Sequence, residues 1–406
     1  MTNRVVITGM GIVSSIGSSV ADVHAALISG YSGMKFLPEM QELGYRCCIF
    51  APVAPYALPE SAAGLAPLLS TAARYGLAAC AEAVQAAGLS PEQLASPAAG
   101  VVFGSGCSGR CDRPGPPAPD AELADPLTAF QLLGGAIPAV IAYHWGMTGP
   151  VASISTACAT GLYNIGAAYE MVREGEVELC LTGSAEGDVW DIVGLSGDNS
   201  NGMPVDWNDR PTQSCRPFDV DRQGFVMSAG AGALVLESLT HARQRGARIV
   251  AEVLGYGAAN DGADIFNASG IGQQLAIDQA FHAAGRLEYR DIDYINAHGT
   301  GTPRGDVVES QLLARLFGEG PLVSSTKGQT GHGQGATAAQ EAVFTAIMLE
   351  HGFVAPTRNL ERIDPDCAGV RHVQQLQAAE LRTAMTINNG LGGVNACLIL
   401  GQPPAA

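Results

Sequence analysis

Lysine is almost missing from this sequence. Only Lys35 and Lys327 are lysines among the 22 basic residues, while acidic residues number 39, which gives a formal net charge of −17 at pH 7. Nucleic acids and anionic membranes attract proteins through a positive surface, so this charge balance argues against both as partners. A motif that contains one of the two lysines therefore needs an explanation.

Long hydrophobic runs are also lacking. Apolar stretches such as residues 229–236 fall far short of the roughly 20 residues that a membrane helix needs. Residues 1–11 contain no basic segment followed by an apolar core, which is the pattern of a secretory signal. We therefore expect a soluble, cytoplasmic protein that does not enter a membrane.

The ten cysteines show no pattern of paired spacing. Cys47 and Cys48 are adjacent and Cys107 lies near Cys111, but neither pair has the spacing of a disulfide framework or a zinc site. Reduced thiols in the cytosol are the simplest interpretation. The sequence predicts no metal site.

Strand and helix patterns alternate along the whole chain in two successive rounds. Apolar residues make up 47% of the chain and charged residues 15%, which is typical of a compact protein with a large buried core. We predict an α/β protein with two similar halves, residues 1–245 and 246–406, that share one core. Long loops are expected at residues 110–125, which are rich in proline, and 198–216.

The expected elements follow from hydrophobic periodicity. In the first half, strands are predicted at residues 5–8, 100–104, 151–155, 177–183 and 231–237, and helices at 20–28, 69–87, 127–145 and 159–173. In the second half, strands are predicted at residues 248–257, 293–297, 322–325, 384–387 and 396–400, and helices at 272–284, 305–317 and 335–350. Gly88 is predicted to cap the end of the long helix before it.

One cysteine, Cys158, has a setting that the others lack. Residues 153–157 are short and strand-like, and the apolar residues after the cysteine repeat at helical spacing, so Cys158 is predicted at or just before a helix start. Free backbone amides and the positive end of the helix dipole lower the pKa of a thiol at such a position. Because Gly161 has no side chain, it leaves room for a substrate to reach the sulfur of Cys158. A cysteine that only packs in the core is the alternative at this point.

Two histidines lie in glycine-rich turns after predicted strands. His298 belongs to Asn-Ala-His-Gly-Thr-Gly-Thr-Pro, and His332 lies five positions after Lys327 in Lys-Gly-Gln-Thr-Gly-His. Loops at strand ends often carry catalytic side chains in α/β proteins. A single histidine of this kind is more often a structural group. Cys158, His298 and His332 each lie in a turn of small residues at the end of a predicted strand. Packing alone does not readily explain three such positions, so together they favour a catalytic site.

These motifs together resemble those of the β-ketoacyl-acyl-carrier-protein synthases of the thiolase-like superfamily. The resemblance rests on Cys158 in Thr-Ala-Cys-Ala-Thr-Gly, on the two histidine motifs and on the closing Gly-Leu-Gly-Gly-Val-Asn of residues 390–395, and it covers essentially the whole chain. Residues 256–264 and 348–356 look most like the bacterial synthase I branch. The resemblance implies the thiolase-like fold, in which two βαβαβαββ halves form five layers in the order α-β-α-β-α.

The resemblance also implies a reaction, a decarboxylative Claisen condensation that extends an acyl chain by two carbons. Cys158 would take the acyl chain from a phosphopantetheine thioester and form a covalent acyl-enzyme. His298 and His332 would donate hydrogen bonds to the enolate oxygen that forms when malonyl-carrier loses carbon dioxide. The backbone amides of Cys158 and Leu391 would hold the oxyanion, and the glycines around Leu391 would let the backbone come close.

Further site residues are implied by the same resemblance. Lys327 and Glu341 match a charged pair that orients the family's site, and Asp306 is expected to complete that buried network. Thr300 and Thr302 match threonines that hydrogen-bond the pantetheine arm, with simple capping of the loop as the ordinary alternative.

Asn395 is expected to fix the last turn of the chain. The implied partners are the acyl carrier protein and a second subunit, in a homodimer or in a heterodimer with a related chain. No cofactor is expected, because the carrier supplies the phosphopantetheine arm and no nucleotide-binding glycine fingerprint follows a strand.

Two departures from the family pattern concern specificity. Leu391 stands where the family has the phenylalanine that gates the acyl pocket, which suggests an altered gate and a different acyl chain. Residues 62–69 are uncharged where synthase I enzymes carry a basic cluster for the acidic carrier, and Arg74 is the nearest basic residue. Other arginines or a partner subunit must therefore supply the positive surface.

Three other kinds of protein share parts of this pattern. A thiolase would use a second cysteine as base, whereas this sequence has histidines in both motifs of its second half. A chain-length factor, the noncatalytic partner in some polyketide systems, typically lacks the nucleophile, and Cys158 is present. A ketosynthase of an aryl polyene or polyketide pathway shares the chemistry and differs in substrate, so it stays open as the alternative to fatty-acid synthesis.

Overall fold

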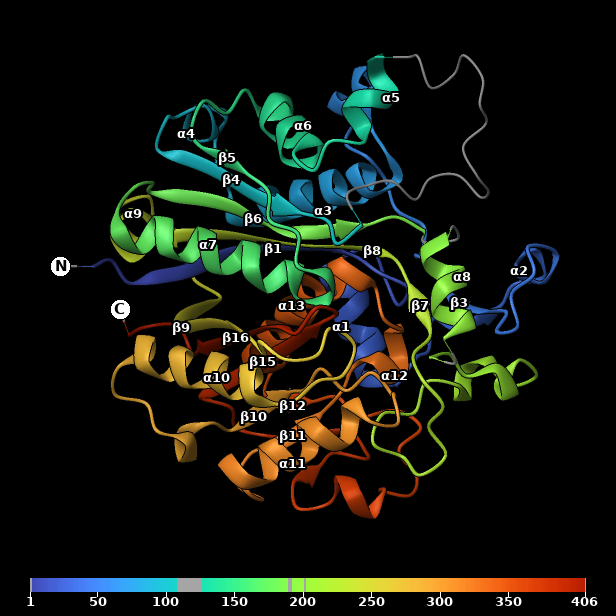
Figure 1. Cartoon of the computed structure of the whole chain (residues 1–406). Coiled ribbons are helices and arrows are strands. Elements are labelled where there is room, and N and C mark those ends of the chain that lie inside the picture. Colours follow the sequence, from blue (N-terminus) through green and yellow to red (C-terminus); the bar gives the residue numbers. More distant parts are fainter. Residues whose placement is uncertain (1, 108–125, 189–191, 201, 406) are drawn as a thin grey trace.

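The computed structural model describes residues 2–405 except 108–125, 189–191 and 201. Its centre is a mixed sheet that, over these ranges, has 11 strands in the order β5-β4-β6-β8-β1-β9-β16-β15-β10-β11-β13 (Figure 1). The strands of the first half are β1 (Val5–Val13), β4 (Ala99–Gly104), β5 (Val151–Ala152), β6 (Leu179–Glu186) and β8 (Gly230–Ser238). Those of the second half are β9 (Ala251–Asn260), β10 (Tyr294–Asn296), β11 (Leu322–Ser324), β13 (Arg371–His372), β15 (Thr383–Gly390) and β16 (Val394–Gly401).

The strand order contains an internal repeat. The first half reads β5-β4-β6-β8-β1 and the second half reads β11-β10-β15-β16-β9, with β13 added at the edge. In each half the second strand in this order, β4 or β10, runs parallel to both of its neighbours. The pairs that follow, β6–β8–β1 and β15–β16–β9, are antiparallel. The predicted pair of similar halves is confirmed; they join where β1 pairs with β9, and the boundary at residue 245 stays a prediction.

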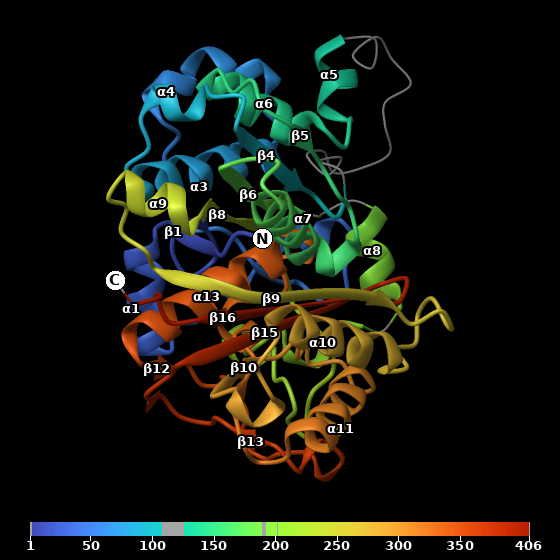
Figure 2. The same ribbon diagram turned by 90° about the vertical axis from the view of Figure 1, so that its left-hand side faces the viewer.

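Helices form three layers around the two halves of the sheet (Figures 1 and 2). The inner layer consists of α7 (Thr160–Glu174) and α13 (Thr337–His351), which pack on each other, on β6 and β8, and on β15 and β16. The outer layer of the first half contains α3 (Thr71–Ala87) and α6 (Ala136–Trp145), and that of the second half contains α10 (Ile271–Ala284) and α11 (Gly305–Phe317). This is the five-layered thiolase-like arrangement that the resemblance implied.

The inner helix α13 is buried on all sides because it lies in the middle of the molecule. Every residue at positions 337–349 is buried, so the helix presents no polar face to solvent. Its neighbours are glycines where the backbones meet: a Cβ on Gly161 would lie 2.2 Å from the Ala339 nitrogen, and one on Gly232 would lie 2.4 Å from the Ala339 carbonyl carbon. Only glycine allows α7, β8 and α13 to approach this closely.

Helix ends follow the signals in the sequence. The Ser70 hydroxyl accepts a hydrogen bond from the Ala73 amide at the start of α3. Gly88 ends the same helix in the left-handed conformation, with φ of 64°, so the predicted cap is confirmed. The bounds of α11 agree with the predicted helix at 305–317.

Three predicted elements of the first half differ from the structure. The strand expected at residues 5–8 is longer, because β1 continues to Val13 along its pairing with β8. The single helix expected at 127–145 is two helices, α5 (Pro126–Gln131) and α6, because Gly134 and Gly135 interrupt the helical segment between them. The strand expected at 151–155 ends at Ala152. The backbone of Ile154 turns inward and bonds the Asn164 side chain, with Nδ2 of Asn164 2.9 Å from the carbonyl oxygen. The predicted loop at 110–125 lies outside the described residues.

The remaining elements are short and connect the layers. The helices are α1 (Val20–Ser29), α2 (Pro38–Glu42), α4 (Pro91–Leu94), α8 (Ile192–Asn199), α9 (Leu239–Gln244) and α12 (Lys327–Thr330). The strands are β2 (Lys35–Phe36), β3 (Ile49–Ala51), β7 (Met227–Ser228), β12 (Phe353–Val354) and β14 (Gln377–Ala378). The 3₁₀ turns are η1 (Glu60–Leu68), η3 (Ala157–Ala159), η4 (Val205–Trp207), η5 (Pro211–Gln213), η6 (Tyr289–Asp291), η7 (Gln334–Ala336) and η8 (Pro365–Cys367). Within the described part of the chain, every helix is too short or too polar to cross a bilayer.

Candidate active site

Cys158 lies in the 3₁₀ turn η3, directly before α7. Ala157 takes a left-handed conformation with φ of 48°, which is strained for a residue with a side chain. The Thr160 hydroxyl holds this turn, because it accepts from the Thr156 amide at 2.9 Å and donates to the Ala157 carbonyl at 2.7 Å. The turn thus fixes the cysteine at the predicted junction of strand and helix.

The structure brings the two predicted histidines to this cysteine. Nε2 of His332 lies 3.1 Å from Sγ of Cys158. The ring of His298, which follows β10, packs edge-on against the ring of His332, with centroids 5.5 Å apart and planes at 87°. His332 therefore contacts the sulfur directly, and His298 lies next to it through its contact with the His332 ring.

Thr337 sets the orientation of the His332 ring. Its hydroxyl oxygen accepts a hydrogen bond from the Gly333 amide at 2.6 Å and lies 3.1 Å from Nδ1 of His332. When the hydroxyl donates its own hydrogen to Nδ1, Nε2 carries the ring proton and points it at the sulfur. The sequence gives no signal for this role of Thr337, because a threonine at a helix start is usually only a cap.

Both imidazoles are held neutral. Burial, with a smaller contribution from the positive charge of Lys327, lowers the pKa of His332 well below its ordinary value. The same two causes, together with His332 itself, lower the pKa of His298. Neutral imidazoles can donate one hydrogen bond each without bringing a positive charge into the buried site.

The expected acidity of Cys158 is wrong for the enzyme at rest. Burial raises the pKa of the Cys158 thiol to about 11, although the charge of Lys327 and the Leu391 amide both oppose that rise. The helix-start effect is weak because the cysteine lies in the preceding 3₁₀ turn, and the nearby Thr156 amide is already bonded to Thr160. The resting pair is therefore a neutral thiol beside a neutral imidazole.

This charge state predicts how Cys158 reacts with iodoacetamide. Since only the thiolate reacts, the alkylation rate should rise about tenfold per pH unit between roughly pH 7 and 10. Mass spectrometry of the peptide that carries Cys158 separates its alkylation from that of other cysteines. A rate that levels off below about pH 8 would show an imidazolium–thiolate pair instead.

Lys327 and Glu341 form a buried ion pair behind the histidines. The lysine side chain is fully buried, and its Nζ lies 2.5 Å from Oε1 of Glu341. The same Nζ donates to the carbonyl oxygen of His298, and Oε2 of Glu341 accepts from Nδ2 of Asn388 at 2.8 Å. The rare lysine thus connects α13, β15 and the turn that carries His298.

Asp306 does not complete this network, contrary to the expectation. Its carboxylate accepts from the Phe218 amide at 2.8 Å and the Gly301 amide at 3.1 Å, and its charged neighbour is Arg222, at 3.8 Å. Burial raises its pKa to about 7. The residue near Lys327 is instead Glu309 of α11, whose two oxygens accept from the amides of His298 and Gly299. Sequence reasoning missed Glu309 because it has no motif of its own.

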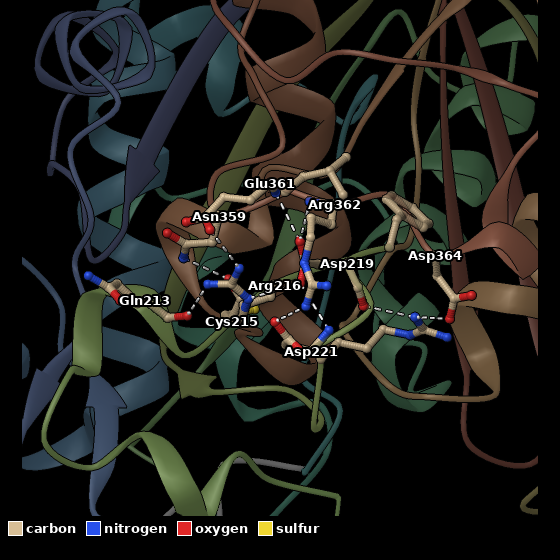
Figure 3. Close-up of polar contacts among 12 residues, drawn as sticks. Gln213, Cys215, Arg216, Asp219, Asp221, Asn359, Glu361, Arg362 and Asp364 are labelled. Atoms are coloured by element: carbon tan, nitrogen blue, oxygen red, sulfur yellow. Dashed lines mark hydrogen bonds and ion pairs between the residues drawn. The ribbon is translucent and has the colours of Figure 1, made fainter.

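A second ion cluster, of which Figure 3 shows the part around Arg216, Asp219 and Asp364, fixes the turn that carries Thr300 and Thr302. Arg222 donates to the carbonyl oxygens of Thr302 and Pro303 and pairs with Asp364 at 2.6 Å. Asp219 accepts from Nε of Arg216 and from two amides of the segment after Asn359. The threonine hydroxyls lie 3.0 Å apart, with Thr300 buried and Thr302 partly accessible.

The hairpin of β15 and β16 places backbone atoms, rather than a side chain, next to the sulfur of Cys158. A Cβ on Gly390 would lie 2.7 Å from the Thr156 carbonyl oxygen, so only glycine fits between β15 and the nucleophile turn. The Leu391 amide hydrogen-bonds Cys158, while the Leu391 side chain is 60% exposed. Nδ2 of Asn395 donates to Asp261 and to the Gly393 carbonyl, which fixes this turn.

One aromatic side chain beside the histidines had no sequence signal. Phe225 packs edge-on against the ring of His332, with centroids 5.5 Å apart. It follows Gly224, whose amide donates to the Gly301 carbonyl in the threonine turn. The apolar ring covers one side of the imidazole and adds to the burial that keeps His332 neutral.

A partly accessible cysteine beside a buried, neutral imidazole, within a repeated thiolase-like fold, defines an enzyme that transfers acyl groups through a thioester on its own sulfur. Comparison with known families identifies the class more closely. The chain belongs to the β-ketoacyl synthase family: residues 2–242 match the family's N-terminal domain and residues 250–361 its C-terminal domain. It is therefore an acyltransferase of the condensing type.

Similar proteins cover the whole chain. The 3-oxoacyl-[acyl-carrier-protein] synthase 1 of Escherichia coli strain K12 is 36% identical over 98% of both chains. A crystal structure of a β-ketoacyl synthase from Burkholderia phymatum superposes with a TM-score of 0.92 at 32% identity, over 99% of this chain and 100% of that one. A type II polyketide ketosynthase in complex with its acyl carrier protein, AntDE with AntF, superposes with a TM-score of 0.88 at 26% identity over 100% of both chains.

Proposed function

We propose that this enzyme joins an acyl group on Cys158 to the two-carbon unit of malonyl-acyl carrier protein, by decarboxylative Claisen condensation. The observation that carries the proposal is the contact of 3.1 Å between Nε2 of His332 and Sγ of Cys158. In the first step, the sulfur attacks the thioester carbonyl of the acyl carrier, and the thiol proton leaves with the carrier's sulfur. This step loads the acyl chain onto the enzyme.

In the second step, malonyl-carrier loses carbon dioxide and leaves an enolate. His298 and His332 donate hydrogen bonds to the enolate oxygen, which neutral imidazoles can do. The carbanion then attacks the acyl carbonyl on Cys158, and the backbone amides of Cys158 and Leu391 stabilise the oxyanion. Collapse of the intermediate expels the Cys158 thiolate and releases a β-ketoacyl-carrier that is two carbons longer.

The supporting residues have roles that follow from their contacts. Lys327 and Glu341 hold the backbone of His298, since Nζ of Lys327 donates to its carbonyl. Thr300 and Thr302 offer hydroxyls to the pantetheine arm, and Asp306 holds their turn through the Gly301 amide rather than touching substrate. Asn395 fixes the turn that presents the Leu391 amide. The enzyme needs no cofactor of its own in this scheme.

The acyl carrier protein is the partner that this reaction requires. The type II polyketide ketosynthase described above is seen with its carrier, which supports a similar complex here. Residues 62–69, most of which lie in η1, carry no charge that would attract an acidic partner, and the guanidinium of the nearby Arg74 donates to the Ala66 carbonyl. We therefore propose that the positive surface comes from elsewhere, and a dimer, of identical or of related chains, is its simplest source.

A specialised polyketide or aryl polyene pathway is the second candidate. The observation that favours it is Leu391, a branched and largely exposed side chain at the turn beside the nucleophile, where a bulky aromatic gate would cover more of the acyl pocket. The chemistry at Cys158 is the same in both cases, so the two candidates differ only in the acyl chain.

Mass spectrometry after incubation with acyl carriers tests both proposals. Saturated, unsaturated and aryl acyl carriers are supplied one at a time, and the peptide that carries Cys158 is expected to gain the mass of the preferred acyl group. Preference for saturated chains indicates fatty-acid synthesis, and preference for conjugated or aryl chains indicates a specialised pathway. If no carrier modifies Cys158 while adducts form on another residue, the proposed nucleophile is wrong.

A further inference from the structure

Glu186 is a buried carboxylate that the mechanism above does not use. It is the last residue of β6 and is fully buried. Its Oε1 accepts from the Ser105 hydroxyl at 2.7 Å, and its Oε2 accepts from the amides of Gly106 at 2.9 Å, Cys107 at 3.2 Å and Gly335 at 3.2 Å. One side chain therefore binds donors from two separate turns.

Both turns border the nucleophile. The first, residues 105–107, follows β4, and the carbonyl of Gly106 accepts from the Ser155 hydroxyl at 3.1 Å. A Cβ on Gly106 would lie 3.1 Å from the carbonyl oxygen of Ala157, the residue before Cys158. The second turn, at Gly335, follows His332 by three residues. Glu186 thus connects the 105–107 turn, which lies beside Cys158, to the segment that carries His332.

The two turns also touch each other at Glu186. A Cβ on Gly335 would lie 2.2 Å from the Gly106 nitrogen, so both positions need glycine for the turns to meet. Within the described ranges Glu186 has no ion-pair partner, and its charge is met only by hydrogen-bond donors without charge. Burial raises its pKa to about 7. A carboxylate is costly at such a site, and an amide or apolar side chain would be cheaper for packing alone.

We propose that Glu186 is a positioning residue for the condensation reaction: it fixes the 105–107 turn and the Gly335 turn around Cys158, and through them the distance from His332 to the sulfur. The inference rests on the proposed function, because it is tested through the rate of condensation. The hydrogen bonds of Glu186 on which it is argued do not depend on which acyl group is the substrate. A carboxylate suits this task because it accepts from several converging amides at once, whereas an amide side chain presents a donor to one of them.

The test is the variant Glu186→Gln, which keeps the size of the side chain and places an NH₂ group among the N–H donors. We expect kcat for condensation to fall on the order of 10- to 100-fold, since small misplacements of reacting groups cost this much. KM for malonyl-carrier should stay within about twofold, because the carrier does not touch this buried site. Ser105→Ala, which removes one donor and leaves the carboxylate, should lower kcat by about threefold.

Glu82→Gln is the matched control. Glu82 of α3 is a half-buried carboxylate that likewise accepts from two backbone amides, those of Ile12 and Val20, but it belongs to the outer layer. This variant should lose thermal stability and keep kcat. Equal losses of kcat in Glu186→Gln and Glu82→Gln, or kcat within twofold of wild type in both Glu186→Gln and Ser105→Ala, would overturn the proposal. If Glu186→Gln does not fold, the kcat values of Ser105→Ala and Glu82→Gln are compared instead. A loss of kcat in Ser105→Ala alone supports the proposal, and equal values contradict it.

Failure of the proposed function gives a different result. If the wild-type chain condenses no acyl and malonyl carrier, the condensation reaction is refuted and kcat is undefined for every variant. The alkylation rate of Cys158 by iodoacetamide then tests the positioning role without a carrier. Because the charge of Glu186 itself raises the pKa of Cys158, the comparison uses Ser105→Ala, which keeps the carboxylate. A rate in Ser105→Ala that differs from wild type by about threefold or more, with Glu82→Gln unchanged, supports the positioning role, and equal rates in all three proteins contradict it.

Discussion

Replacing Cys158 by alanine is expected to abolish condensation and leave the fold intact. The Cys158 thiol holds the acyl chain covalently in the proposed reaction, so kcat should fall on the order of a thousandfold or more. The substitution removes one sulfur atom from a partly accessible turn, and the contacts that hold the turn come from Thr160 and the backbone. Stability should therefore change by about 1 kcal/mol or less. Condensation is measured with acyl and malonyl carriers, and the fold by circular dichroism.

A second substitution at the same position separates the two chemical steps. Cys158→Gln places an uncharged amide where the acyl thioester would lie, next to the hydrogen-bond donors of His298 and His332. We expect it to release carbon dioxide from malonyl-carrier faster than the uncatalysed background, without forming a β-ketoacyl product. His332→Ala in the same background should remove that release. Condensation that survives in Cys158→Ala would refute the nucleophile, and no release in Cys158→Gln would refute the roles of the histidines.

Much of this site could be predicted from the sequence because its parts lie in local motifs. A cysteine before a helix and two histidines in glycine turns are each visible within a few residues, and the repeat of strands and helices predicts two similar halves. The structure brings the sulfur and the two imidazoles together as the family resemblance implied. The glycines at 161 and 390 have a local reason as well, since each is a point of close backbone approach.

The electrostatics could not be predicted in the same way. The sequence places Cys158 near a helix start, which lowers a pKa, but only the folded chain shows that burial outweighs that effect and raises the pKa of the thiol to about 11. Asp306 was assigned to the Lys327 network by its place in a motif, whereas the fold pairs it with Arg222. Glu309 and Glu186 carry no motif, because what they bind is backbone from distant turns.

The second large effect is expected at Glu341, the only carboxylate bonded to the buried lysine among the described residues. Glu341→Ala leaves the ammonium of Lys327 without its partner in a site from which solvent is excluded. Breaking such a pair costs about 3–5 kcal/mol, far more than the loss of an exposed pair. The lysine must then shed its proton or draw in water, and either change moves the carbonyl of His298 that it holds. Both the free energy of unfolding and the condensation rate should fall.

The double variant Lys327→Met with Glu341→Leu distinguishes these two losses. Replacing the whole pair by apolar side chains of similar volume removes the unpaired charge, so most of the lost stability should return. Activity should not return, because the donor to the His298 carbonyl is gone. Urea unfolding followed by circular dichroism measures the first quantity and condensation the second. Asp221→Ala, which breaks the exposed pair with Arg362, is the matched control and should change stability by about 1 kcal/mol or less. A loss in Glu341→Ala no larger than in that control would show that the buried pair does not support the fold.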